Sequence, residues 1–109
     1  MKTSSDPRHK IRLAKVNDLF AQSFTRGFTT AIDPTIATAA PEWPLAKINK
    51  IDLAVLRVAA EELLHSDTPE KVVIDEAVEI AKSLGTESSS GFINGVLGTI
   101  LKGKHAQTI

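Results

Sequence analysis

Residues 50–65, KIDLAVLRVAAEELLH, predict a helix with apolar side chains on almost every side. Asn49 stands directly before this segment and is a candidate N-cap. A surface helix buries one apolar stripe, whereas a helix that is apolar all round needs neighbours on several sides. We therefore expect residues 50–65 to form the buried centre of a helical bundle.

A basic helix is predicted near the start of the chain. Asp6 and Pro7 suit the N-cap and the first position of a helix that we expect over residues 7–25. Residues 1–15 hold five Lys or Arg against one Asp, whereas residues 61–87 hold eight acidic residues against two Lys. The formal net charge of zero therefore conceals a basic end, which is either a phosphate-binding surface or an ordinary solvated helix start.

A further helix is expected between Pro69 and Gly85, because proline suits the start of a helix and glycine suits its end. Helical spacing predicts an apolar inner face made of Ile74, Ala77, Val78, Ala81 and Leu84. The predicted outer face is charged and consists of Glu76, Glu79 and Lys82.

The last predicted helix, residues 86–102, carries glycines on one face, with Thr86, Ser88 or Ser89 as its cap. Its core side consists of Ile93, Val96, Leu97 and Ile100, and the opposite side of Gly91, Gly95 and Gly98. Glycine inside a helix costs about 0.8–1 kcal/mol relative to alanine, so this face is either slack or a surface where something approaches the backbone. Phe92 lies at the boundary, either as an edge of the core or as an aromatic that stacks on an unpaired base.

Residues 27–47 lie between the first and the central helix and contain three prolines, many Thr and Ala, and little charge. This composition is typical of a connector with at most a short helical turn or two. A chain of 109 residues forms one domain. We predict a single all-α domain over residues 1–109, with about four main helices: a basic first helix over 7–25, the connector 27–47 and a C-terminal helical core over 48–102.

Several functional classes are disfavoured by what the sequence lacks. There is no Cys, so a disulfide framework and a Cys-ligated metal are excluded. His9, His65 and His105 are scattered and are predicted to be lone surface histidines, and no catalytic constellation is recognisable. The first residues lack the apolar core of a signal peptide, and no apolar run approaches the length of a membrane span. We expect a cytoplasmic, noncatalytic protein without a metal or cofactor and without membrane contact.

Residues 50–101 resemble the C-terminal half of the NusB transcription antitermination family. The resemblance is carried by Ile51-Asp52, Ala54-x-Leu56-Arg57, Ala60-x-Glu62-Leu63, Pro69-x-Lys71-Val72-x-Ile74-x-Glu76-Ala77, Ala81-Lys82-x-Leu84-Gly85 and Phe92-x-Asn94-Gly95-Val96-Leu97. The stretch RHKIRLAKVNDLF is more weakly similar to the basic first helix of that family.

The resemblance implies a helical, RNA-binding transcription antitermination factor that binds single-stranded boxA-type RNA together with the ribosomal small-subunit protein NusE. Such a complex keeps RNA polymerase elongating through ribosomal RNA operons, which makes the transcription elongation complex a partner. The residues nominated for RNA are Arg8, His9, Lys10, Arg12, Phe20, Phe92 and Asn94. Asp52 is nominated for the partner-protein surface.

The chain also departs from the family pattern. Members are usually longer, and the second and third helices of the family correspond here to the uncharged connector. We hypothesise that a homodimer supplies the lost burial. The alternatives are a protein-interaction module that has lost RNA binding and a NusB-like domain related to RNA methyltransferases. His9 stands where the family usually has arginine, which would make one phosphate contact dependent on pH.

Overall fold

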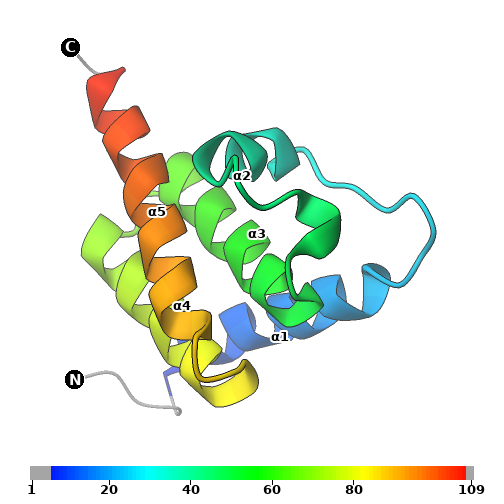
Figure 1. Ribbon diagram of the computed structural model, residues 1–109. Helices are drawn as coiled ribbons and strands as arrows, with labels where there is room; N and C mark the ends of the chain where they lie inside the picture. Colours follow the sequence, from blue (N-terminus) through cyan, green and yellow to red (C-terminus); the bar gives the residue numbers. More distant parts are fainter. Residues whose placement is uncertain (1–5, 108–109) are drawn as a thin grey trace.

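The computed structural model describes residues 6–107, and this part of the chain is helical without strands (Figure 1). The prediction of an all-α fold is confirmed. The elements are α1 (Pro7–Gln22), α2 (Asp33–Ala39), the single 3-10 turn η1 (Leu45–Lys47), α3 (Lys50–His65), α4 (Glu70–Leu84) and α5 (Ser89–Ala106).

The central position of α3 is confirmed. It packs against α1, α2, α4 and α5, and Figure 1 shows it in the middle of the molecule. Its apolar residues are buried on several sides of the helix, and they are Leu53, Ala54, Val55, Leu56, Ala59, Ala60 and Leu63. The all-round apolar pattern of the sequence therefore reflects contact with four neighbouring helices.

Several helix ends form as local chemistry predicts. The side chain of Asp6 accepts a hydrogen bond from the backbone N–H of Arg8 (2.9 Å), and Asn49 Oδ1 accepts one from Ile51 (2.8 Å). Gly85 follows the end of α4. Two ends differ by a few residues: α1 ends at Gln22, and α4 begins at Glu70 with Pro69 outside the helix.

At the start of α5, Ser88 is the residue before the helix, but no side chain caps the first turn. Instead, the hydroxyl of the buried Ser89 accepts a hydrogen bond from the backbone N–H of Thr86 (2.9 Å). Of the three candidate caps, Ser88 therefore occupies the N-cap position without making a capping hydrogen bond. Ser89 instead makes a buried hydrogen bond with the preceding loop.

The predicted faces of α4 are partly wrong. Glu76 was placed on the solvent side but is 4% exposed, whereas Leu84 was placed in the core but is 39% exposed. Val73 and Ile80 take core positions that the sequence reasoning had not assigned to them. The inner face is rotated because Glu76 meets the guanidinium of Arg12 in α1, which allows a carboxylate to be buried.

The connector contains the short helix α2, in agreement with the expected helical turn or two, and it also contributes to the core. Ile36 is completely buried. Arg57 of α3 donates two hydrogen bonds of 2.8 Å to the buried carboxylate of Asp33, which also accepts hydrogen bonds from Thr30. Burial opposes ionisation of Asp33, but the hydrogen bonds from Arg57 and Thr30 outweigh it and lower the pKa. Phe28 covers the Arg57 guanidinium, with its ring centroid 5.1 Å away.

The faces of α5 are confirmed, since Ile93, Val96, Leu97 and Ile100 are all buried. A Cβ atom added at Gly91, Gly95 or Gly98 would have no neighbour within 4 Å, so the glycine face is open. The helix ends at Ala106, beyond the predicted end at residue 102. Within residues 6–107, no helix is long and apolar enough to cross a membrane.

Contacts with α3 and α4 hold the C-terminal part of α5. Lys104 Nζ donates to the backbone carbonyl of Leu63 (2.9 Å) and also lies 2.9 Å from Glu70 Oε2. His105 is exposed, but its Nε2 lies 2.9 Å from Glu70 Oε1. Hydrogen bonds from Lys104 and His105 lower the pKa of Glu70.

Candidate nucleic-acid interface

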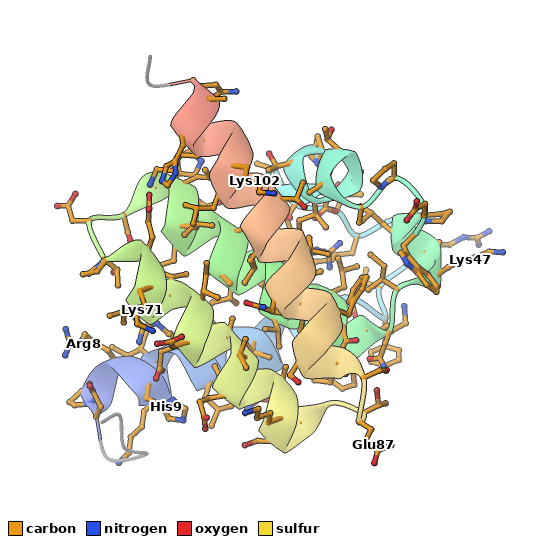
Figure 2. All side chains as sticks on the ribbon, turned by 60° about the vertical axis from the view of Figure 1, so that its left-hand side comes forward. Arg8, His9, Lys47, Lys71, Glu87 and Lys102 are labelled. Atoms are coloured by element: carbon orange, nitrogen blue, oxygen red, sulfur yellow. The ribbon has the colours of Figure 1, made fainter. Side chains whose placement is uncertain are left out.

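Two cations at the beginning of α1 face solvent. The side chains of Arg8 and Lys10 are exposed, and Figure 2 shows Arg8 extending from the edge of the molecule. The only carboxylate that restrains Arg8 within the described residues is Asp6, at 3.4 Å. Both cations are therefore accessible to a phosphate group.

The other two predicted RNA residues of this turn face the protein. His9 Nδ1 lies 2.9 Å from Glu76 Oε1, and Arg12 donates to Glu62 (2.9 and 2.6 Å) and to Glu76 (3.3 Å). We call His9, Arg12, Glu62 and Glu76 the α1 cluster. The side chain of His9 is 15% exposed, so the prediction of a lone surface histidine is wrong for this residue.

Electrostatics in the α1 cluster favour the charged forms of its best-paired groups. Hydrogen bonds from Arg12 lower the pKa of Glu62, and those to Glu62 raise the pKa of Arg12. Arg12 is only 8% exposed and already carries two carboxylate partners. Its side chain fastens α1 to α3 and α4, and this attachment leaves Arg8 and Lys10 on the solvent side.

An aromatic pair with a neighbouring cation lies where α1 ends and α3 begins. Phe20 is half-buried and contacts Phe24 edge-on, with ring centroids 5.2 Å apart. Phe24 is 64% exposed, and Lys50 Nζ lies 5.3 Å from its ring centroid. The i,i+4 spacing of Phe20 and Phe24 was the available signal for a pair, but nothing local indicated Lys50.

The predicted residues of α5 lie beside different hollows. Phe92 is half-buried and contacts the exposed Trp43, with ring centroids 6.1 Å apart and an interplanar angle of 76°. Asn94 is exposed and lines an open groove between α4 and α5, together with the acidic residues Asp75 and Glu79. The structure therefore does not bring Phe92 and Asn94 to one point.

Asp52, the residue nominated for a partner protein, is 7% exposed in the first turn of α3. It lines the same cavity as Trp43 and Phe92. A partner group would therefore have to enter this cavity to reach the carboxylate. Among the described residues, no group of three or more His, Cys, Asp or Glu is arranged to hold a metal ion.

A central buried helix surrounded by other helices, with a basic first helix and exposed aromatic rings, makes this an all-α domain with a candidate nucleic-acid surface on α1. Residues 4–102 match the sequence profile of the NusB family. The chain belongs to this family.

Similar proteins with established names support this membership in the NusB family. The chain is 42% identical over 90 residues to the transcription antitermination protein NusB of Macrococcus caseolyticus, covering 80% of this chain and 69% of that protein. It is 51% identical over 73 residues to the protein of the same name from Chloroflexus aggregans. This match covers 64% of this chain and 49% of that protein. The chain thus spans about half to two thirds of the length of these relatives. The solved structure of T. maritima NusB superimposes with a TM-score of 0.79 at 34% identity, covering 94% of this chain and 93% of that chain.

Proposed function

We propose that the chain is a noncatalytic, RNA-binding transcription antitermination factor. The observation that carries the proposal is that the cations of α1 have two different surroundings. Arg12 is held by Glu62 and Glu76, while Arg8 and Lys10 of the same turns are exposed. The names of the relatives, transcription antitermination protein NusB, support the same function.

The proposed RNA is single-stranded and of boxA type, and its contacts follow from the chemistry of each side chain. Arg8 and Lys10 contact phosphates, and Phe20 and Phe92 stack on unpaired bases. Asn94 is exposed in the groove between α4 and α5, apart from Phe92, and donates or accepts hydrogen bonds there. His9 and Arg12 act by holding α1 in place rather than by presenting free charge.

The proposed partners are the ribosomal small-subunit protein NusE and the transcription elongation complex, in the cytoplasm. Asp52 belongs to the partner-facing surface as the family resemblance implies, but its burial limits contact to groups that enter the cavity above it. We also hypothesise a homodimer, because the exposed Phe24 and Trp43 provide apolar area for a second copy. Sedimentation that shows a stable monomer would eliminate the dimer.

The test of RNA binding is a titration of boxA-like RNA at several salt concentrations, with and without NusE. The logarithm of affinity should fall linearly with the logarithm of salt concentration, with a slope of about −0.7 for each phosphate contact. Three to five contacts predict a slope of roughly −2 to −3.5.

A variant carrying Arg8→Ala and Lys10→Ala should lose about two of these contacts. Lys102→Ala is the matched control, because Lys102 is exposed on the C-terminal half of α5, far from α1 in Figure 2. No binding at low salt, with or without NusE, would reject the proposal and favour a protein-interaction module that lacks RNA binding.

A further inference from the structure

His9 differs from its two neighbours in the first turn of α1. The side chains of Arg8 and Lys10 are exposed, whereas that of His9 is 15% exposed and is directed towards α4. Its Nδ1 atom lies 2.9 Å from Oε1 of Glu76, a residue that is 4% exposed. Nη1 of Arg12 lies 3.3 Å from the same oxygen atom. Of these two side chains of α1, His9 therefore makes the shorter contact with the buried carboxylate.

Protonation of His9 strengthens this contact. A neutral imidazole can donate an ordinary hydrogen bond from Nδ1 to the carboxylate, whereas an imidazolium donates one in which both partners are charged. The charged hydrogen bond is the stronger of the two. Water screens it little, because the side chains of His9 and Glu76 are only 15% and 5% exposed. The first turn of α1 is therefore attached more tightly to α4 when His9 carries a proton.

Other charged side chains of α1 and α4 lie on the solvent side or at the helix start. On α4, Lys71 pairs with Asp75 at 3.1 Å, and both are exposed, as is Glu79 one turn further along. On α1, the carboxylate of Asp6 accepts hydrogen bonds from Arg8. The charged groups that face His9 are Glu76 from α4, Arg12 from α1 and, through Arg12, Glu62 from α3.

The turn that His9 attaches also carries the two cations assigned to phosphate contacts. Arg8 and Lys10 stand on either side of His9 in the chain, and both remain on the solvent side of α1 while the ring between them is directed inward. Groups that are held in place before a ligand arrives lose less conformational freedom when it binds. The strength of the contact between His9 and Glu76 therefore affects RNA affinity through Arg8 and Lys10.

We propose that His9 is a positioning residue that makes RNA binding depend on pH. Histidine changes its charge between about pH 5 and 8. The protonated form holds the first turn of α1 firmly, so RNA affinity decreases as the pH rises through this range. The sequence had indicated a pH-dependent phosphate contact, but the inward direction of the ring favours an indirect effect. The inference rests on the proposed RNA-binding function and adds to it regulation by a proton.

The experiment measures the affinity for boxA-like RNA by fluorescence anisotropy at about pH 6 and about pH 8, each at several salt concentrations. The wild type should bind about fivefold more tightly at the lower pH. The salt slope should be the same at both pH values, because a positioning residue adds no phosphate contact. A protonated histidine that touched a phosphate would instead make the slope steeper by about 0.7 at the lower pH.

Two variants of His9 test the role of the proton. His9→Gln can still donate a hydrogen bond but is never charged, so its affinities at the two pH values should agree within about twofold. His9→Arg is always charged and should also lose the pH dependence. His65→Gln is the matched control, because His65 is exposed at the end of α3, and it should keep the wild-type ratio. Circular dichroism at both pH values verifies folding, and His9→Arg decides the matter if His9→Gln does not fold.

Four results would overturn the inference. If the wild type binds RNA equally at both pH values, no proton regulates binding, and the proposed function stands. If the salt slope is steeper by about 0.7 at the lower pH, His9 contacts a phosphate itself. If His9→Gln keeps the wild-type ratio, another group titrates. If no RNA binds at either pH, the proposed function fails together with the inference.

Discussion

Replacement of Arg12 by alanine separates two roles that a basic residue of α1 can have. Arg12 was nominated as an RNA contact by family resemblance, but its side chain lies in the α1 cluster. It donates hydrogen bonds of 2.9 and 2.6 Å to Glu62 and one of 3.3 Å to Glu76. If the cluster holds α1 on the protein, the main effect of Arg12→Ala is on stability.

The magnitude follows from burial. Removing one partner of a buried ion pair costs about 3–5 kcal/mol, because the remaining charge loses its compensation. Arg12 is 8% exposed and Glu76 is 4% exposed, but the Glu62 side chain is 18% exposed and is partly screened by water. We therefore expect Arg12→Ala to lower the free energy of unfolding by about 3 kcal/mol, the lower end of that range.

Urea unfolding followed by circular dichroism measures this loss, and RNA titration at several salt concentrations measures the phosphate contacts. Lys10→Ala is the control, since it removes a cation from the exposed side of the same helix. It should leave the free energy of unfolding within about 0.5 kcal/mol and make the salt slope shallower by about 0.7.

Arg12→Ala should show the opposite pattern when RNA binding is measured under conditions where the variant is folded. Its stability should fall while its salt slope stays near that of the wild type. Wild-type stability of Arg12→Ala together with a slope that is shallower by about 0.7 would refute the reasoning, because Arg12 would then be a phosphate contact and the cluster would not hold α1.

Four further predictions concern other parts of the protein. Phe92→Ala should weaken RNA binding by roughly 1–3 kcal/mol if the ring stacks on a base, whereas a lower melting temperature with unchanged affinity would make Phe92 a core residue only. Gly95→Ala should stabilise the protein by about 0.8–1 kcal/mol in thermal unfolding, because the new methyl group meets no atom within 4 Å. Gly85→Ala should destabilise it, because the methyl group would collide with Ser89 and lie 2.9 Å from the carbonyl of Ala81. Asp33 and Glu62 have lowered pKa values in the folded protein. The unfolded chain therefore binds protons first as the pH falls below about 4.5, and the free energy of unfolding should decrease there, less so in Asp33→Asn.

The sequence predicted those features of the fold that depend on interactions between residues close together in the chain. The cap residues Asp6 and Asn49 act within three residues of themselves, and both were assigned correctly. The burial of α3 also followed from its composition alone, because no other position in the bundle suits a helix without a polar side. The membership of the chain in the NusB family was recognisable from motifs in this same region.

Long-range pairing was the part that sequence could not supply. Glu76 was predicted to face solvent, since burial of a carboxylate is favourable only beside a partner, and the partner Arg12 is 64 residues away in the chain. The same reason explains why the burial of Asp33 was missed, because it depends on Arg57. For the RNA residues, the resemblance named positions, but only the structure separates the exposed Arg8 and Lys10 from the inward-facing His9 and Arg12.

The salt bridge between Asp33 and Arg57 has a consequence for how this domain tolerates changes in length. Lys50 Nζ donates a hydrogen bond to the carbonyl of Ser23 (3.3 Å) at one end of residues 23–32, and the Asp33–Arg57 pair fixes the other end, so the exposed turn at residues 25–27 can change in length while both ends stay in place. Lengthening a loop whose ends are already anchored adds only a small entropic cost that grows with the logarithm of its length. Figure 1 shows this stretch looping away from the helices. Residues 25–27 are thus a permissive position for inserting a fluorescent or affinity peptide without loss of the fold.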